Sequence, residues 1–390
     1  MRLSKAAIPL GHAWSSPFAR WQGPLANVNA IDLAVEVAGR ALKDRNIDPE
    51  TITYLAAGAT IPQAGSFYLV PGIAARLGFA GVTGPAISQA CATSAATIQA
   101  AAVQVETGAH DLALAVTTDR TSNGPTMVYP VPSRPGGAPV TEHGVLDPIA
   151  RDPATGQSML DTAENVAAEA GYAKEELDEV ALLRYEQYRA GHGVRARVLV
   201  EVDIPGRKSS VVLREDHGIH DTTAEGLAKL GPARPGGVVS FGTQTHPADG
   251  TAGTVVASLE RARELGAGVA QILSVNYARV EAAHMPKAPV PAALAALRDA
   301  EMTIEDVDVV ATHNPFAVND LYFSRETGFP LDRMNPAGCS LVYGHPQGPT
   351  GARAVAELIE VLRERGGGVG LFTGCAAGDT AGALVLRVTD

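Results

Sequence analysis

Hydrophobic segments of strand length alternate with segments of helical periodicity in the first third of the chain. This pattern predicts a helix over 30–43, a strand over 52–57, a helix over 70–77 and strands over 86–88 and 112–117. Between the last two strands, residues 91–107 are rich in alanine and are followed by Gly108, a residue typical of a helix C-terminus. The order predicts β-α-β units packed around a buried central helix.

The last third of the chain repeats this pattern with a different sequence. Its predicted elements are a helix over 253–265, a strand over 270–277, a helix over 291–301, a strand over 307–312, a helix that begins near Pro349, and strands in GVGLFTG and GALVLRV. Between the two parts, Pro- and Gly-rich stretches alternate with charged helical patterns, which indicates an inserted lobe. We therefore predict an N-terminal half over 1–120, an inserted domain over 121–237 and a C-terminal half over 238–390.

Composition and charge narrow the classes of function. The 390 residues are 46% hydrophobic and 19% charged, which is a globular composition and excludes disorder as the main state. The formal charge of −11 and the lack of any long Lys/Arg run argue against nucleic-acid or polybasic membrane partners. The longest uncharged segment, 77–105, holds too many Gly, Gln and Ser residues for a membrane span. With three cysteines and no signal-peptide pattern, we expect a cytoplasmic protein without a disulfide framework or a metal site.

Four short segments carry candidate chemistry. Cys91 lies between a predicted strand and the first turn of a helix, whose unpaired N–H groups favour a reactive thiolate. His345, in GHPQGPTGAR, lies on a glycine-rich turn from which an imidazole can accept a proton or donate to an oxyanion. Cys375 precedes a turn of small residues, and His313 follows a strand, where substrate groups commonly bind. Taken alone, each has an ordinary alternative: a buried structural cysteine or a solvated histidine.

Taken together and in order, these motifs resemble those of the thiolase family over nearly the whole chain. Cys91 in QACATSA matches the family's nucleophile, and HNPF matches its N-E-A-F or H-E-A-F motif. The segment NPAGCSLVYGHPQGPTGAR matches the family pattern built around G-H-P-x-G, and Cys375 falls at the cysteine of its C-x-G motif. TAENVA in the insertion is similar to a loop-domain segment of the family, and GTQTHPADG resembles its G-N-A-S-G-x-N-D-G.

The resemblance implies an α/β fold with duplicated α/β/α/β/α layers and an inserted loop domain. It implies ping-pong acyl transfer in which His345 deprotonates Cys91 and the thiolate forms an acyl-enzyme. Cys375 is the implied second acid/base, and His313 and His345 would line one oxyanion hole. The other implied contacts, to a second oxyanion hole and to coenzyme A, come from Thr245, Phe316, Ala377 and Gly378. Coenzyme A is the implied co-substrate, and no permanently bound cofactor is implied.

The chain departs from the family pattern at positions that bear on its substrate. Asn314 replaces the glutamate of the family motif, and Gly231 replaces an arginine associated with the adenine of coenzyme A. His313 together with NPAG is more similar to the trifunctional and sterol-carrier-protein thiolases than to short-chain biosynthetic ones. We therefore expect a degradative enzyme for a 3-ketoacyl-CoA with an unusual acyl group, assembled as a homodimer or tetramer. Two alternatives stay open: a subunit that needs a small partner protein to complete its coenzyme A site, and a carrier-protein-dependent condensing enzyme.

Overall fold

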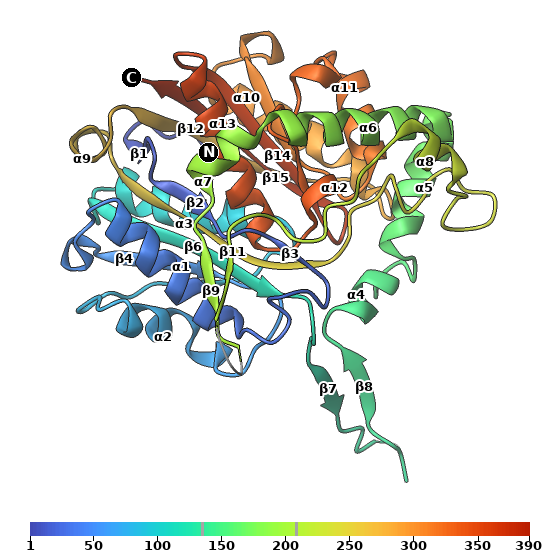
Figure 1. Cartoon of the computed structure of the whole chain (residues 1–390), viewed down its shortest axis with the longest axis horizontal. Helices are drawn as coiled ribbons and strands as arrows, with labels where there is room; N and C mark the ends of the chain where they lie inside the picture. The colour runs from blue at the N-terminus through green and yellow to red at the C-terminus, as the bar shows by residue number, and fades with distance from the viewer. Residues whose placement is uncertain (134–135, 207–209) are drawn as a thin grey trace.

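A single mixed sheet organises the protein, as the computed structural model of residues 1–133, 136–206 and 210–390 shows (Figure 1). Residues 134–135 and 207–209, which belong to the predicted insertion, lie outside the described residues. The strands follow the spatial order β13-β14-β15-β12-β1-β11-β6-β4-β5, with β2 and β3 also paired to β11. The bounds of these strands are β1 (Ala6–Pro9), β2 (Ala13–Ser15), β3 (Ala19–Arg20), β4 (Tyr54–Gly58), β5 (Ala86–Ile87), β6 (Leu112–Arg120), β11 (Ala248–Ser258), β12 (Val269–Arg279), β13 (Val309–His313), β14 (Gly368–Ala376) and β15 (Thr380–Thr389).

The sheet consists of two similar halves that meet at β1. In one half β4 runs parallel to β6, with Ala57 opposite Val116, and in the other β13 runs parallel to β14, with Ala311 opposite Phe372. Strand β1 is antiparallel to both β11 and β12 and so joins the halves through Ala7. The carboxyl ends of β13 and β14, and the turn that follows β5, carry the candidate residues identified from the sequence.

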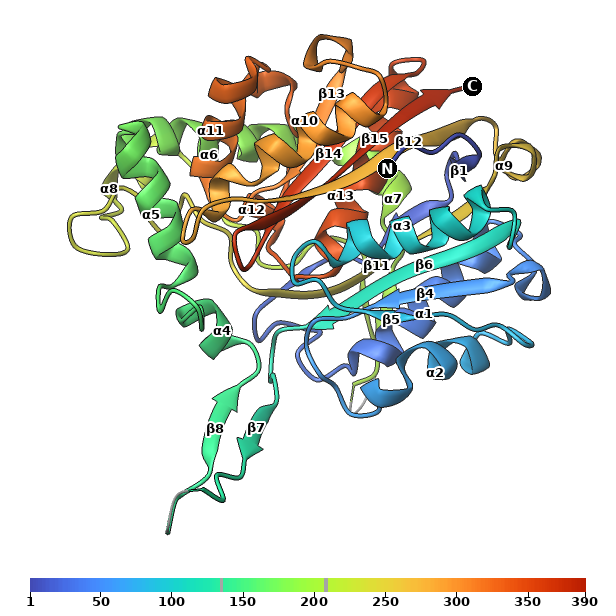
Figure 2. The same cartoon turned by 180° about the vertical axis from the view of Figure 1, so that it is seen from behind.

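Helices form three further layers around the two halves of the sheet (Figures 1 and 2). Helices α3 (Thr93–Glu106) and α13 (Pro349–Glu364) pack against each other and against strands of both halves, so they form the middle layer. Helices α1 (Ala30–Asp44) and α2 (Leu69–Arg76) cover one outer face, and α10 (Pro289–Asp299) covers the other, beside α11 (Ala317–Thr327). The predicted five-layer α/β fold is confirmed by this arrangement.

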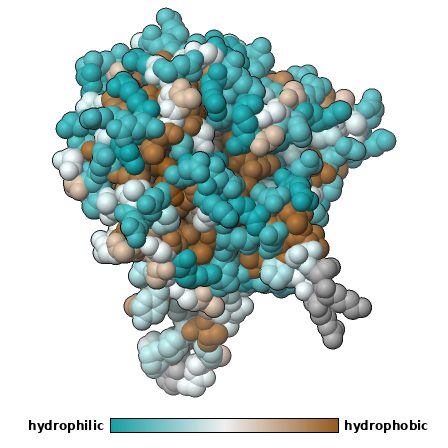
Figure 3. Space-filling model, turned by 60° about the vertical axis from the view of Figure 1, so that its left-hand side comes forward, coloured by the Kyte–Doolittle hydropathy of each residue, from teal (hydrophilic) through white to brown (hydrophobic). Residues whose placement is uncertain are grey.

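The insertion is built mostly from short elements. They are β7 (Thr126–Tyr129), β8 (Val140–His143), α4 (Leu146–Ala150), α5 (Met159–Ala170), α6 (Lys174–Ala190), α7 (His192–Val198), β9 (Val202–Ile204), β10 (Val211–Leu213) and α8 (Ala224–Lys229). Helices α5 and α6 pack against α11, and α7 packs against α13. The β7–β8 hairpin extends away from the body in both views (Figures 1 and 2), and hydrophobic side chains lie on its projecting surface (Figure 3), where Val128 and Val140 are exposed.

A buried ion pair fastens the insertion to the middle layer. Arg353 of α13 donates two hydrogen bonds to Asp216, with Nη1–Oδ1 and Nη2–Oδ2 distances of 2.6 and 2.7 Å. Both side chains are fully buried, and the guanidinium lies 3.7 Å from the ring centroid of Tyr343. Because breaking such a pair leaves an uncompensated charge in the protein interior, Asp216 ties the insertion firmly to α13.

One predicted element is wrong. The helix expected over 253–265 is in fact the second part of β11, which ends at Ser258, followed by the short helix α9 (Leu259–Leu265). Both faces of β11 are buried, so its small and β-branched residues lack the polar alternation that distinguishes a half-exposed strand from a helix. Its pairing with β6 also associates residues 248–258 with the N-terminal half of the sheet, whereas the predicted division assigned them to the C-terminal half. Among the described residues, no helix is both long enough and apolar enough to cross a membrane.

Candidate active site

Cys91 lies on a sharp turn between β5 and α3. The turn passes through Ala90, whose φ of +45° is in the left-handed region that side-chain-bearing residues rarely adopt. Thr93 stabilises it with two hydrogen bonds, because its hydroxyl donates to the carbonyl of Ala90 at 2.6 Å and accepts from the amide of Gln89 at 2.8 Å. Cys91 therefore precedes the first helical residue by two positions and remains half-buried, with its thiol facing the C-terminal half.

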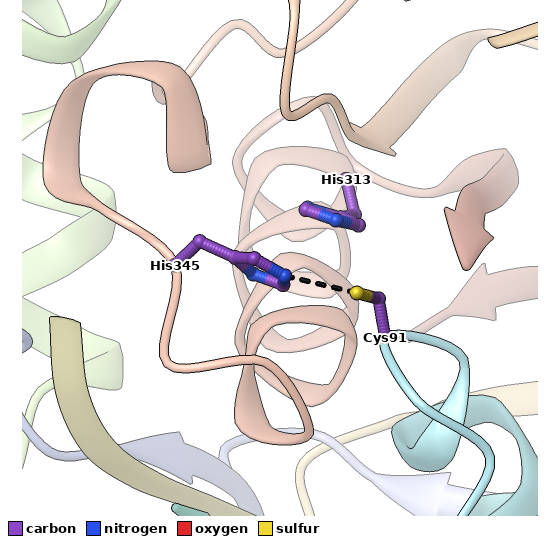
Figure 4. A group of neighbouring side chains, drawn as sticks. All are labelled: Cys91, His313 and His345. Atoms are coloured by element: carbon purple, nitrogen blue, oxygen red, sulfur yellow. Dashed lines mark hydrogen bonds between the residues drawn. The ribbon is translucent and has the colours of Figure 1, made fainter. Parts of the chain in front are cut away.

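His345 reaches Cys91 from the loop that leads into α13. Gly344 turns the chain there with a φ of +87°, and the imidazole Nε2 lies 3.1 Å from the Cys91 Sγ (Figure 4). The other ring nitrogen, Nδ1, lies 2.6 Å from the hydroxyl of Thr350 in the first turn of α13. If Nδ1 carries the proton and donates it to Thr350, Nε2 is free to accept the proton of the thiol. This is the arrangement of a nucleophile, a base and a group that orients the base.

His313, at the end of β13, lies against the other imidazole. The rings of His313 and His345 are stacked, with centroids 3.9 Å apart and planes inclined by 20° (Figure 4). Its Nδ1 is 3.0 Å from the hydroxyl of Ser340, whereas its Nε2 is buried and has no hydrogen-bond partner among the residues that the structure describes. An imidazole held in this way has a ring nitrogen available for a ligand oxygen.

The pKa of the Cys91 thiol is higher than expected for a free thiolate, and burial also shifts the pKa values of the two imidazoles. Burial raises the pKa of the Cys91 thiol to about 12, although the backbone of Ala377 opposes this shift by hydrogen bonding. Burial lowers the pKa of His313 to about 3 and holds that of His345 well below 6.5. Loss of hydration on burial is the largest cause of the shift at Cys91, and it acts against the free thiolate expected from the sequence. At neutral pH the pair is a thiol beside a neutral imidazole.

Cys375 lies in the same site, near the end of strand β14. It is fully buried, and the side-chain amide nitrogen of Asn319 lies 3.3 Å from its sulfur. Burial holds the pKa of Cys375 well above its usual value, and the charge of Cys91 adds to the shift, which places the two sulfurs within electrostatic range. The structure thus brings together all four residues expected to take part in catalysis: Cys91, His313, His345 and Cys375.

The residues expected to bind coenzyme A lie around this group in different environments. The hydroxyl of Thr245 donates to the carbonyl of Ser340 at 2.5 Å, so it is already hydrogen-bonded within the protein. Phe316 is 5% exposed and packs in the apolar cluster that includes Cys375. Ala377 is exposed and Gly378 has a φ of +79° in the turn between β14 and β15. Their contacts with coenzyme A stay predictions.

Sequence reasoning missed several residues that orient the site. Asn319, Ser340 and Thr350 contact predicted residues directly, and Asp119 holds the loop that follows His345 through Gly348. Asp119 is buried and accepts hydrogen bonds from the amides of Thr60, Ile61 and Gly348, and so joins the chain after β4 to the start of α13. Burial raises the pKa of this carboxyl to about 7. Only Thr350 had a signal in the sequence, as a hydroxyl in the GHPQGPTG motif.

Among the described residues, two groups of side chains have the donor atoms of a metal site. The ligand atoms of Cys91, His313 and His345 lie within 4.8 Å of one another, and such nitrogen and sulfur donors suit Zn²⁺. The second group joins Glu169, Glu281 and His284, but there the ammonium of Lys287 contacts both carboxylates at 2.6 Å and takes the position of a cation.

Comparison with known proteins gives matches over nearly the full length. The family model described as thiolase, N-terminal domain, matches residues 11–260, and that described as thiolase, C-terminal domain, matches residues 267–388. An acetyl-CoA acetyltransferase of Synechocystis sp. is 31% identical over 388 residues, with 95% of this chain and 96% of that protein covered. A beta-ketoadipyl-CoA thiolase of Acinetobacter baylyi is 29% identical, with 95% and 97% covered.

Solved structures show the same fold. The crystal structure of the Bacillus anthracis acetyl-CoA acetyltransferase matches with a TM-score of 0.91 at 29% identity and covers 99% of both chains. That of human mitochondrial 3-ketoacyl-CoA thiolase in complex with CoA also has a TM-score of 0.91, at 24% identity, and covers 100% of both chains. The second likeness concerns the fold alone.

Proposed function

The chain belongs to the thiolase family and is an acyltransferase, and from this premise we propose that it transfers acyl groups to and from coenzyme A by a ping-pong reaction through Cys91. The observation that carries the proposal is the 3.1 Å contact between the Cys91 sulfur and His345 Nε2, beside a second buried thiol, Cys375. A nucleophile and a separate acid/base are the two groups that such a reaction requires.

In the first half-reaction, the Cys91 sulfur attacks the carbonyl carbon of a thioester as its proton moves to His345 Nε2. Because the pKa of the thiol is raised and that of the imidazole is lowered, proton transfer accompanies the attack rather than preceding it. The backbone of Cys91 and Ala377 is suited to stabilise the tetrahedral oxyanion, since both lower the pKa of the thiol by hydrogen bonding. The departing coenzyme A thiolate takes the proton of Cys375, which leaves acyl-Cys91, a thiolate at Cys375 and a protonated His345.

In the second half-reaction of synthesis, Cys375 acts as a thiolate and takes a proton from the α-carbon of a second thioester. The enolate oxygen is held by Nε2 of His313 and His345, and its carbon attacks the acyl group on Cys91. The new C–C bond forms, the C–S bond to Cys91 breaks as the Cys91 sulfur recovers its proton from His345, and a 3-ketoacyl-CoA leaves. Degradation uses the same groups in reverse, with Cys375 as the proton donor to the enolate.

We further propose coenzyme A as the co-substrate and a 3-ketoacyl-CoA as the substrate, consumed in the degradative direction. The curated relatives are named for acetyl-CoA, beta-ketoadipyl-CoA and 3-ketoacyl-CoA, and a structural neighbour carries CoA. The unusual acyl group rests on Asn314, which is fully buried and donates to Asp320 at 2.6 Å, in place of the family's glutamate.

The proposal includes a cytoplasmic protein that assembles as a homodimer or tetramer. Strand β5 lies at the end of the strand order, with one edge unpaired among the described residues, and Phe67 and Tyr68 on the preceding segment are 90% and 64% exposed. An unpaired edge beside exposed aromatic side chains suits pairing with a second copy. Sedimentation analysis tests the assembly, and a monomer at micromolar concentration would contradict it.

The two alternative functions are not favoured by the comparisons. The relatives described above are an acetyl-CoA acetyltransferase and a beta-ketoadipyl-CoA thiolase, and both match over nearly the whole chain. A small partner protein that completes the coenzyme A site is a distinct proposal, and it predicts that activity appears only when the partner is added.

Intact-protein mass spectrometry after brief exposure to a panel of acyl-CoA and 3-ketoacyl-CoA esters tests the proposed function. We expect wild-type protein to gain the mass of one acyl group and Cys91→Ala to gain none. Cys339→Ala is the matched thiol control, because Cys339 is buried with Asn314 as its side-chain partner and no hydrogen bond joins it to Cys91, His345 or Cys375 among the described residues, and it should be acylated like wild type. Absence of any adduct on folded wild-type protein would reject acyl transfer by the isolated chain.

A further inference from the structure

Cys375 is enclosed by apolar side chains, and Asn319 is the polar side chain that reaches its sulfur. The cysteine is fully buried and belongs to a cluster with Phe316, Val318 and Leu341. Within it, the Asn319 Nδ2 lies 3.3 Å from the Cys375 Sγ. A thiolate formed in such surroundings has little water to stabilise it, so each hydrogen bond that the protein donates has a large effect.

The position of Asn319 is fixed by its neighbours in the first turn of α11. The backbone amide of Asn319 donates to the carbonyl of Phe316 at 3.0 Å. The next residue, Asp320, accepts from Arg184 Nε at 2.7 Å and from the hydroxyl of Thr312 at 2.9 Å. Both members of this ion pair are fully buried. The turn that carries Asn319 is therefore anchored to the insertion and to β13, and its amide is held against the sulfur.

The charges around Cys375 oppose its ionisation. The pKa of Cys375 is raised first by burial and then by the negative charges of Cys91 and Asp320. The two imidazoles nearby, His313 and His345, are neutral because burial lowers their pKa values. The side chain that acts in the opposite direction is Asn319, whose hydrogen bond lowers the pKa of Cys375.

We infer that Asn319 is a positioning residue for proton transfer, which holds the Cys375 sulfur in place and donates a hydrogen bond to its thiolate. The inference rests on the proposed function of Cys375. The proton moves from the α-carbon of the thioester to sulfur, the C–H electron pair becomes that of the enolate, and the negative charge leaves Cys375. Before the transfer, Asn319 Nδ2 donates a hydrogen bond that stabilises the charge of the thiolate. After the transfer, the neutral thiol no longer offers Nδ2 a charged acceptor.

The side-chain amide of Asn319 also carries an acceptor, which suits a Cys375 that alternates between thiolate and thiol. The Oδ1 of Asn319 is buried and has no hydrogen-bond partner within the described part of the chain. A buried acceptor of this kind is unfavourable unless a donor becomes available. Rotation of the amide places Oδ1 against the sulfur, where it accepts from the S–H group, so one side chain serves both the thiolate and the thiol.

The test combines a titration with the two half-reactions. In a Cys91→Ala, Cys339→Ala background, Cys375 is the single thiol, and the ultraviolet absorbance of its thiolate reports its titration directly. We expect Asn319→Leu to move this titration to higher pH, and Asn319→Asp to move it further by placing a carboxylate beside the sulfur. With all cysteines present, we expect both variants to slow condensation about 10-fold or more, part of the roughly 10²–10⁴-fold that general acid–base catalysis supplies. Acylation of Cys91 should stay near the wild-type rate.

Phe323→Leu is the matched control, since it removes packing from the same helix in a cluster that does not include Cys375. It should lower the melting temperature and leave the Cys375 titration unchanged. Asn319→Gln retains an amide and should restore part of the titration shift. The inference is overturned if Asn319→Leu and Asn319→Asp titrate like the parent, or if their loss of condensation follows thermal stability as in Phe323→Leu. Failure of wild type to form an acyl-enzyme would reject the proposed function, whereas the titration would still report on Asn319.

Discussion

The two thiols of the site lie in surroundings that differ in polarity and in partner. Cys91 is half-buried on a strained turn and contacts the imidazole of His345, whereas Cys375 is fully buried at the end of a strand and contacts the amide of Asn319. Burial raises the pKa of both, so neither is a free thiolate at neutral pH. The difference is that Cys91 has an imidazole at hydrogen-bond distance, whereas within the described residues Cys375 has an amide there.

This contrast separates two kinds of reactivity in one chemical group. A thiol with a neighbouring base can lose its proton as it attacks, which suits a nucleophile. A thiol with a neutral amide partner must exchange its proton with the substrate, which suits an acid/base. The N-terminal half thus supplies the proposed nucleophile, and the C-terminal half supplies its base and the second thiol.

Removal of the nucleophile should have the largest effect. We expect Cys91→Ser to lower overall turnover by at least about 10⁴-fold, because the loss of a covalent nucleophile removes a whole half-reaction. Steady-state assay of 3-ketoacyl-CoA cleavage measures this. Turnover within about 10-fold of wild type would show that Cys91 is not the nucleophile.

Removal of the second thiol should separate the half-reactions. We expect Cys375→Ala to form acyl-Cys91 from an acyl-CoA at close to the wild-type rate but to lose condensation by about 10²–10⁴-fold, the range of general acid–base catalysis. Rapid quench and mass spectrometry follow the two steps separately. Equal loss in both steps would mean that the two cysteines do not divide the chemistry as proposed.

Loss of the group that orients His345 should have a smaller effect. Thr350→Val keeps the shape of the side chain but removes the hydroxyl 2.6 Å from His345 Nδ1. We expect acylation to slow by about 10–100-fold, as for other groups that orient a functional histidine, with melting temperature little changed. If Thr350→Val slowed the exchange of substrate α-protons with solvent as much as it slowed acylation, the hydroxyl would not act through His345.

The buried imidazole of His313 should make folding stability depend on pH with a definite sign. The pKa of His313 is about 3 in the folded protein, below the 6.5 of an exposed histidine, so the unfolded chain binds more protons below pH 6.5. Folding stability should therefore fall as pH decreases from about 6.5 towards 3, by about 1.4 kcal/mol per pH unit for this residue. Denaturant titrations of wild type and His313→Asn across this window measure it, and parallel curves would contradict the assignment.

Elements of the layered fold could be predicted from the sequence where burial of one face leaves a periodic pattern of hydrophobic residues. Helix α1 alternates buried and exposed positions and was located within one residue, at Ala30–Asp44. The helix expected over 253–265 failed because β11 is buried on both faces and its sequence of small and β-branched residues carries no such pattern. Periodicity reports exposure, so it is uninformative where every residue is inside.

The contacts of the site could also be predicted only in part, for a different reason. The motifs around Cys91 and His345 predicted that these residues meet, and they do so at 3.1 Å. The contact of Asn319 with Cys375 joins positions 56 residues apart, and nothing in the local sequence of either predicts it. The protonation of Cys91 also depends on how much water the folded chain excludes, which a helix N-terminus in the sequence does not reveal.

The ion pair between Asp216 and Arg353 limits how the protein can be divided into modules. Excision of the insertion, or its exchange for that of a relative, would leave the Arg353 guanidinium without its carboxylate partner beside Tyr343 and Phe18. Glu357 would remain as a single acidic neighbour on the same helix. A graft of the insertion therefore has to carry an acidic residue at position 216, because α13 and the insertion share this buried ion pair.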